Sequence, residues 1–368
     1  MYIRFEDRVQ QSALELQQAV GLIQVSHAHE LDAAFAAIER AHQDGYWIGL
    51  VLNYELMQLW EPRIPARPSH QPLLSALVFE QAQAVPVWDS LAPLSLQAKT
   101  KIQRALYEQH ISEILADIQA GNYYQINYSI PIELQSPMRP RELYAALATR
   151  HPVAYGCYVE LQQRRILSLS PELFLHKVGA DIAMRPMKGT MPRHADPVLD
   201  QAAAEQLARS DKDRAENVMI VDLLRNDLGS IAEVGSVQTT SLFDIERYAS
   251  VWTMTSHIQA RVRQDVDLQQ LLQALFPCGS ISGAPKLASM QKIRELERHQ
   301  RGIYCGALGY WSPKDELKLS VAIRTLELNE HGQGMLGVGG GIVHDSEAAK
   351  EWQECFWKAR ILNSPIAT

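Results

Sequence analysis

The stretch LKLSVAIRTLELNEHGQGMLGVGGGIV (317–343) decides the fold class of this chain. In its first half, apolar side chains alternate with small or polar ones, which is the two-residue period of a β-strand. The apolar positions are Leu317, Leu319, Val321 and Ile323. HGQG (331–334) supplies a turn, and MLGVGGGIV (335–343) returns as a second strand. The stretch therefore predicts two antiparallel strands joined as a hairpin.

Strands and helices elsewhere in the chain do not alternate one for one. Short strands are expected at 155–161, 165–170, 173–178 and 181–187. Apolar spacing predicts helices over 102–118 (ended by Gly121), 204–228, from Pro285 onward, and 347–362. Because a wound parallel sheet needs regular alternation, we predict an α+β fold with large, mostly antiparallel sheets.

Composition limits the class of partner. The chain has 368 residues, 46% of them hydrophobic, and a formal net charge of −7. An acidic protein lacks the basic face that non-specific nucleic-acid binding requires, but a locally positive pocket for an anionic substrate remains compatible. We expect no signal peptide and no membrane span. The cysteines, Cys157, Cys278, Cys305 and Cys355, form no CxxC pair, so we expect a cytoplasmic protein.

Two predicted helices each carry a pair of acidic residues three positions apart. The pairs are Asp213 with Glu216 and Glu351 with Glu354. This spacing puts both carboxylates of a pair on one helix face. If the two faces converge, they form an oxygen-rich site suited to Mg²⁺. The alternative is that both are solvated helix surfaces.

Lys188 and Glu172 are candidates for chemistry. Lys188 lies in RPMKGTMPR (185–193), and a lysine in a dry pocket can act as a nucleophile. Glu172 follows an apolar strand, where burial would favour a general acid. The alternatives are an exposed loop lysine and a turn residue after Pro171.

Other features point to an anionic ligand. The glycine-rich segments GSISGAPK (279–286) and VGGGIV (338–343) match neither a Walker nor a dinucleotide-binding motif, but both offer backbone N–H groups to an anion. Arg324, among apolar strand residues, is either paired within a sheet or directed at an anionic ligand. The residues by themselves thus indicate an anionic small-molecule substrate.

A series of motifs, in this order, resembles the chorismate-utilising enzymes, which include anthranilate, aminodeoxychorismate, isochorismate and salicylate synthases. The motifs are GNYYQIN (121–127), SPELF (170–174), PMKGT (186–190), DRAENVMIVDLLRNDL (213–228), FPCGSISGAPK (276–286), RGIYCGALGY (301–310), VAIRT (321–325), GGGIVHDS (339–346) and EWQE (351–354). The resemblance covers about 100–362 and leaves 1–95 weakly recognisable. It implies a single domain over 1–368, with a two-sheet β-sandwich core surrounded by helices.

The resemblance also implies roles for site residues. Glu216 and Glu354 would ligate Mg²⁺, and Asp213 and Glu351 would act through bound water or hydrogen bonds. Glu172 would be the general acid that assists departure of the 4-hydroxyl of chorismate. The residues implied to bind substrate carboxylates are Tyr304, Arg324, Lys358, Gly340 and Gly341. Ser280 and Thr190 would line the pocket.

Two positions separate the branches of the family. At Gln125, isochorismate and salicylate synthases carry a lysine that activates water, and glutamine has no basic nitrogen for that purpose. At Lys188, anthranilate synthases carry alanine, whereas PMKGT resembles the lysine-containing motif of aminodeoxychorismate synthases. The resemblance implies attack of Lys188 on C2 of chorismate, followed by attack of ammonia on C4 to give 4-amino-4-deoxychorismate.

The chain departs from the family pattern at Thr253, where relatives often carry a histidine, and it lacks a clear LLES-type segment associated with tryptophan binding. No glutaminase signature is visible, so we expect a separate glutamine amidotransferase subunit to supply ammonia. A further lyase would then release p-aminobenzoate for folate synthesis. The alternatives are an anthranilate synthase component I, a non-catalytic chorismate-binding subunit, and an isochorismate-type hydroxylation, which Gln125 disfavours.

Overall fold

Strands form the core of the protein, and almost all of them pair antiparallel. The computed structural model describes residues 1–248 and 251–367. Among the described strands, the parallel exception is β19 (Ile366–Ala367) beside β5 (Gln97–Thr100). Helices lie against the sheet instead of alternating with its strands, so the predicted α+β class is confirmed. No helix in the described ranges is long and apolar enough to cross a membrane.

The strands pair into one ladder with two halves. The first half contains, in pairing order, β12 (Gln238–Arg247), β13 (Val251–Arg261), β10 (Asp181–Met184), β9 (Leu173–Val178), β16 (Glu316–Val321), β15 (Ala307–Trp311), β3 (Trp47–Leu52), β4 (Leu74–Val85) and β2 (Ser12–Val25). The second contains β1 (Tyr2–Asp7), β7 (Tyr155–Leu161), β8 (Arg164–Ser170), β17 (Thr325–Leu328), β18 (Gln333–Ile342), β6 (Gln125–Gln135) and β5. Pairing of β1 with β2 joins the halves.

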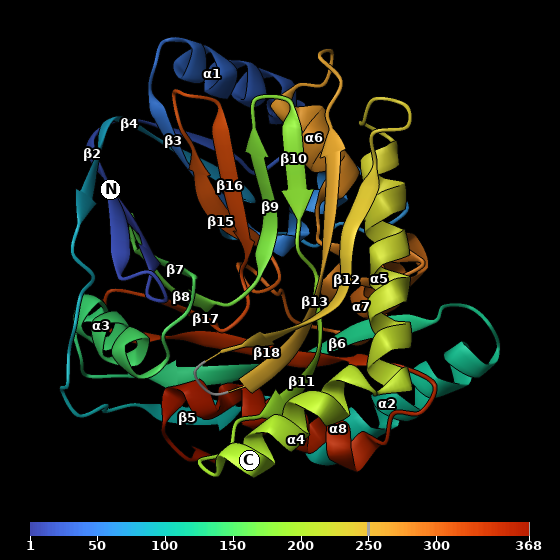
Figure 1. Cartoon of the computed structure of the whole chain (residues 1–368). Coiled ribbons are helices and arrows are strands. Elements are labelled where there is room, and N and C mark those ends of the chain that lie inside the picture. The colour runs from blue at the N-terminus through green and yellow to red at the C-terminus, as the bar shows by residue number, and fades with distance from the viewer. Residues whose placement is uncertain (249–250, 368) are drawn as a thin grey trace.

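The two halves cross one another and pack together. In Figure 1, β9, β10, β13 and β16 run upright, whereas β6, β17 and β18 run across the lower part of the molecule. Side chains from both halves, including Ile3, Phe79 and Val159, form a buried cluster between them. The two sheets of the predicted sandwich are therefore the two halves of one continuous ladder.

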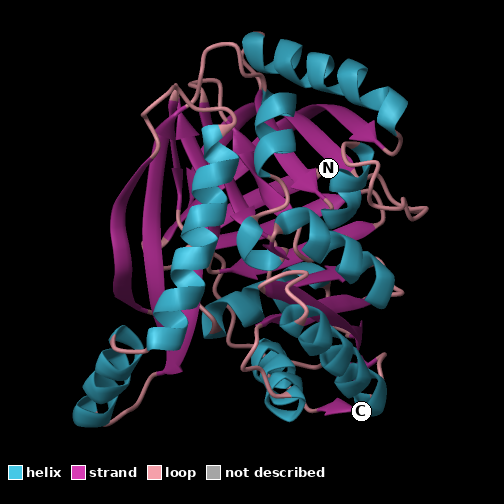
Figure 2. Cartoon of the chain, turned by 90° about the vertical axis from the view of Figure 1, so that its right-hand side faces the viewer, coloured by secondary structure: helices cyan, strands magenta, loops and turns pink. Residues whose placement is uncertain are grey.

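Helices cover the outer faces of both halves (Figure 2). The first half packs on α1 (Leu31–Gln43), α5 (Asp211–Gly229) and α6 (Leu268–Leu275). The second packs on α2 (Arg104–Gln119), α3 (Pro140–Arg150), α7 (Lys286–Leu296) and α8 (Ala348–Lys358). Among the described residues, the remaining α-helix is α4 (Pro197–Ala208), which lies beside β11 (Met187–Pro192). Strand β11 pairs with β13. The short strand β14 (Gly283–Ala284) pairs with β6. Each half thus has an apolar core of its own.

The stretch 317–343 is only partly a hairpin. Its return strand is confirmed, since β17 and β18 pair with Leu326 opposite Leu336. The prediction is wrong for 317–323, because β16 ends at Val321 and pairs with β15 and β9 in the other half of the ladder. The chain changes halves at Ala322–Arg324, where Arg324 adopts φ 50°. This left-handed residue separates the apolar positions of 317–323 from Leu326 and Leu328, whose alternation has the opposite phase.

The helix predicted over 204–228 is also interrupted. α4 ends at Ala208 and α5 begins at Asp211. Ser210 starts the second helix as its N-cap, since its Oγ accepts a hydrogen bond from the backbone N–H of Asp213 at 3.2 Å. A cap of this kind satisfies a donor that a helix start leaves unpaired. The cap places Asp213 and Glu216 in the first turns of α5.

The other predicted elements are observed. The strands expected at 155–187 are β7 to β10, although the last ends at Met184 and β11 begins after a gap. Gly121 has φ 81° just beyond α2, and Pro285 immediately precedes α7. The final helix ends at Lys358 and continues as the 3-10 turn η4 (Ala359–Leu362).

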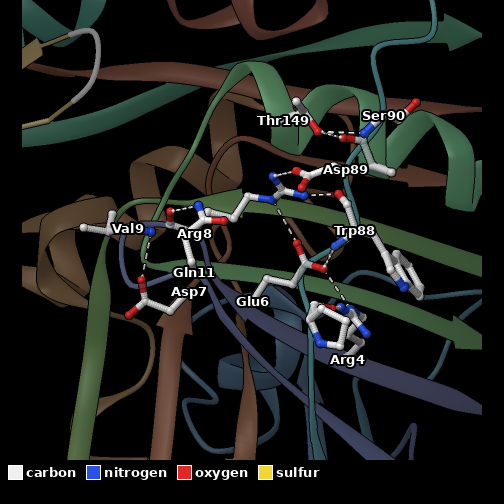
Figure 3. Close-up of polar contacts among 12 residues, drawn as sticks. Arg4, Glu6, Asp7, Arg8, Val9, Gln11, Trp88, Asp89, Ser90 and Thr149 are labelled. Atoms are coloured by element: carbon white, nitrogen blue, oxygen red, sulfur yellow. Dashed lines mark hydrogen bonds and ion pairs between the residues drawn. The ribbon is translucent and has the colours of Figure 1, made fainter.

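A buried charge cluster ties the N-terminal strand to the segment that follows β4 (Figure 3). Glu6 accepts hydrogen bonds from Arg4 Nε at 2.8 Å and from Arg8 Nε at 2.9 Å. It also accepts the backbone N–H of Trp88 at 3.0 Å, and both arginines donate to carbonyls at 86–88. The weakly recognisable residues 1–95 therefore contribute to the same ladder, while the single-domain boundary stays a prediction.

Glu6→Gln is expected to lower the free energy of unfolding by about 3–5 kcal/mol, because it leaves two buried guanidinium groups without their shared carboxylate. Urea unfolding measures the change. Asp89→Asn is the matched control, since Asp89 pairs with Arg8 at 3.0 Å but its side chain is 69% exposed. We expect a change below about 1 kcal/mol there. Equal effects of the two substitutions would contradict the cluster's importance.

Candidate active site

Lys188 lies on β11, where side chains from the two halves of the ladder approach one another. A Cβ atom built on Gly341 of β18 would lie 3.2 Å from Lys188 Nζ and 3.2 Å from the amide nitrogen of Gln125 on β6. Glycine at 341 therefore lets lysine, glutamine and the β18 backbone approach one another. Burial lowers the pKa of the Lys188 amine, against the opposing charges of Glu216 and Glu172. A lowered pKa increases the neutral, nucleophilic fraction of a lysine.

Glu172 lies near Lys188, in the turn between β8 and β9. Its side chain is buried, and Ser280 Oγ donates a hydrogen bond to Glu172 Oε1 at 2.7 Å. Burial raises the pKa of Glu172 to about 7, although the Ser280 hydrogen bond and the Lys188 charge oppose the shift. A carboxyl group with this pKa can donate a proton near neutral pH.

The predicted acid pairs of α5 and α8 lie near Lys188 and the neighbouring glycines. A Cβ on Gly340 would lie 3.3 Å from Glu351 Oε2 and 3.4 Å from Glu354 Oε1. Burial raises the pKa of Glu216 despite the nearby positive charge of Lys188, and the negative charges of Asp213 and Glu354 add to the rise. The carboxylates thus act on one another electrostatically across the two helices, as a shared cation site requires.

Lysines neutralise part of this negative charge. Lys358 Nζ lies 2.7 Å from Glu354 Oε1 and donates to the carbonyl of Gly339 at 2.7 Å. Lys212 Nζ lies 3.9 Å from Glu216 Oε1. Within 1–248 and 251–367, no three His, Cys, Asp or Glu side chains are gathered as ligands of one ion. The carboxylate oxygens nevertheless have the chemistry that Mg²⁺ prefers.

Arg324 supplies a partly buried positive charge at the point where the chain changes halves. Burial lowers its pKa, and among the described residues its guanidinium forms no ion pair. Its backbone carbonyl accepts a hydrogen bond from Leu169 N at 3.0 Å, at the left-handed turn. A guanidinium without a carboxylate partner is suited to an anionic ligand.

The remaining predicted residues differ in their surroundings. Gln125 is fully buried, and neither its Oε1 nor its Nε2 has a hydrogen-bond partner. Tyr304 is buried against the backbone of Gly337, so its ring packs on β18. Thr190 is exposed on β11, so it is not enclosed together with Lys188.

The sequence interpretation missed two polar contacts of the acidic residues. Ser346 Oγ donates to Glu351 Oε1 at 2.7 Å, and Lys212 approaches Glu216. Ser346 lies in the GGGIVHDS segment, so this motif could have identified Ser346 as a site residue. Lys212 precedes the acid pair of α5 without any pattern that marks it.

A surface groove of about 740 Å³ lies between α5 and β14. Its lining includes Tyr124, Val218 and Ala284 but neither Lys188 nor Glu172. Tyr124 precedes Gln125 and Ala284 pairs with it, so the groove lies close to the backbone of Gln125. The titratable residues, rather than this groove, define the candidate site.

The chain is similar to known proteins over most of its length. Residues 89–364 match the family model described as chorismate binding enzyme. Aminodeoxychorismate synthase component 1 of Klebsiella aerogenes is 39% identical over 288 residues, which cover 78% of this chain and 63% of that protein. Anthranilate synthase component 1 of Streptomyces coelicolor is 36% identical over 266 residues, covering 72% and 52%. The chain thus spans less than two thirds of the length of these relatives.

Solved structures share the fold. Anthranilate synthase component I from Streptococcus pneumoniae superposes with a TM-score of 0.83 and 24% identity, covering 96% of this chain and 92% of that one. The menaquinone-specific isochorismate synthase from Escherichia coli gives a TM-score of 0.78 with 18% identity, covering 98% and 87%. The anthranilate synthase component I-like fold is therefore confirmed, and the chain belongs to the family of chorismate-binding enzymes.

Proposed function

We propose that this chain is an aminodeoxychorismate synthase component I, which converts chorismate and ammonia into 4-amino-4-deoxychorismate and water. The observation that carries the proposal is the position of Lys188. Its amine lies beside Gln125 and Gly341, with its pKa lowered by burial. Similarity to proteins named aminodeoxychorismate synthase component 1 supports the same branch.

The first half of the reaction forms a covalent bond. Arg324 and the β18 backbone N–H groups hold the substrate carboxylates. Neutral Lys188 attacks C2, the ring double bonds shift, and the C4–O bond breaks. Glu172 donates its proton to the departing hydroxyl, which leaves as water, and the carboxylate then takes up the proton that the alkylated Lys188 nitrogen releases.

The second half returns the lysine. Ammonia attacks C4, the double bonds shift back, and the bond between C2 and Lys188 breaks. The attacking nitrogen loses a proton and the lysine regains one. The net reaction replaces the 4-hydroxyl group of chorismate with an amino group. Division of one difficult substitution into two steps is the advantage of covalent catalysis.

The carboxylates of Glu216 and Glu354, supported by Asp213 and Glu351, are proposed to hold Mg²⁺. When bound, this ion would neutralise the ring carboxylate of the substrate. Without the ion, Lys358 offsets the negative charge of Glu354. The Mg²⁺ requirement follows from the oxygen chemistry of these side chains.

An anthranilate synthase activity is the second candidate, because relatives of that name are 36% identical to this chain. In that reaction ammonia attacks C2 and pyruvate departs. A Lys188 amine near the substrate competes for the same carbon, which favours the aminodeoxychorismate product. Gln125 lacks the basic nitrogen that activation of water requires, and this disfavours an isochorismate product.

The ammonia would come from a separate glutamine amidotransferase subunit. The name component 1, carried by the relatives, implies a partner for those proteins. A further lyase would release p-aminobenzoate for folate synthesis, in the cytoplasm.

Incubation of the purified chain with chorismate and an ammonium salt, with and without Mg²⁺, tests the function. Mass spectrometry of the product is expected to show aminodeoxychorismate with its pyruvyl group attached, formed only with Mg²⁺ present. Fluorescent anthranilate would instead support the second candidate. Chorismate recovered unchanged, also after addition of a glutaminase subunit, would indicate a non-catalytic binding protein. Turnover undiminished by a chelator would contradict the metal site.

A further inference from the structure

The backbone on both sides of Lys188 is held by β13. Before the lysine, the carbonyl of Pro186 accepts a hydrogen bond from Ser256 N at 3.2 Å. After it, the ladder shifts register, since Lys188 pairs with Met254 and Thr190 pairs with Thr253. Gly189 is therefore an extra residue in β11, that is, a β-bulge.

Gly189 is constrained from the α5 side as well. It has φ 82°, and a Cβ there would lie 2.9 Å from Asp213 Cβ. Both facts require glycine at the bulge. The freedom that glycine brings must then be limited by other contacts if the lysine is to keep one position.

Thr253 provides such a contact. Its side chain is 2% exposed, and its Oγ1 donates a hydrogen bond to the carbonyl of Gly189 at 3.1 Å. This hydrogen bond ties the carbonyl of the bulge to β13.

We propose that Thr253 is a positioning residue for Lys188, which fixes the Gly189 bulge so that the lysine amine points at the substrate carbon. This inference deepens the proposed function and rests on it. A nucleophile must approach its target within about 3–3.5 Å, and a displacement of about 1 Å costs about 10²-fold in rate. Loss of one hydrogen bond at a glycine bulge allows a displacement of this size.

Thr253→Val keeps the shape of the side chain and removes the hydroxyl. We expect kcat for amination of chorismate to fall about 10- to 100-fold, with KM changed less than about threefold. Thr253→Ser restores the donor and should recover most of kcat. Thr255→Val is the matched control, because Thr255 is equally buried on the same strand and its hydroxyl donates to Glu246 at 2.7 Å instead.

Labelling of Lys188 by an amine-reactive reagent, without chorismate, provides a readout that needs no turnover. Mass spectrometry follows the labelled fraction against pH. We expect the midpoint of this labelling curve to move to higher pH in Thr253→Val. In Thr253→Ser and Thr255→Val the midpoint should stay at the wild-type pH. Such a shift in the labelling midpoint supports the inference independently of turnover. Full turnover by Lys188→Ala would overturn the proposed function but not the positioning role of Thr253.

The inference is overturned if Thr253→Val has both wild-type kcat and wild-type labelling. It is also overturned if Thr255→Val produces the same losses, since these would then reflect packing of β13. Thermal unfolding of each variant shows that it is folded at the assay temperature.

Discussion

Lys188→Ala is expected to reduce kcat for amination of chorismate by at least about 10³-fold, because it removes the nucleophile on which both halves of the proposed reaction depend. Wild-type protein incubated with chorismate and without ammonia should carry an adduct of chorismate less one water. Mass spectrometry of peptides should place that adduct on residue 188. The alanine variant should carry none.

Lys212→Ala is the control for the loss of a positive charge near the acidic residues. Lys212 lies 3.9 Å from Glu216, but its side chain is 54% exposed. We expect its replacement to change kcat less than about threefold, since an exposed ion pair contributes little. Full activity of Lys188→Ala, together with an unmodified lysine in the wild type, would disprove the covalent route.

Glu172→Gln is expected to lower kcat by about 10²- to 10⁴-fold. Glutamine preserves the size of the side chain and an oxygen for the Ser280 hydroxyl, but it has no acidic proton to give to the leaving group. The pH dependence follows from the pKa of about 7 for Glu172. The protonated acid predominates below that pH, so wild-type kcat should fall as the pH rises through 7.

Ser280→Ala tests the origin of this pH dependence. The Ser280 hydrogen bond stabilises the carboxylate of Glu172 and lowers its pKa. Its removal should therefore raise the pKa and move the alkaline limb of the profile to higher pH. In Glu172→Gln the alkaline limb near pH 7 should disappear. A limb that remains in the glutamine variant would assign the titration to another group.

The sequence by itself determined most of the local elements and marked the candidate residues for chemistry. Short apolar runs in 155–184 specified β7 to β10, and β7 and β8 are buried along most of their length, so both faces of these strands are apolar. The motifs also selected Lys188, Glu172 and the two acid pairs. These side chains approach one another because packing brings β11, the turn before β9, α5 and α8 together.

Only the tertiary structure decided which strands become neighbours. The apolar positions are odd-numbered from Leu317 to Ile323 and even-numbered at Leu326 and Leu328, but only the pairing shows that β16 and β17 join opposite halves of the ladder on either side of the left-handed Arg324. The contact of Thr253 with Gly189 was likewise invisible in local patterns, whereas Ser210 and Asp213 match the S-x-x-D signature of a helix start. Periodicity records which face of an element is apolar, whereas pairing and register depend on packing between segments distant in sequence.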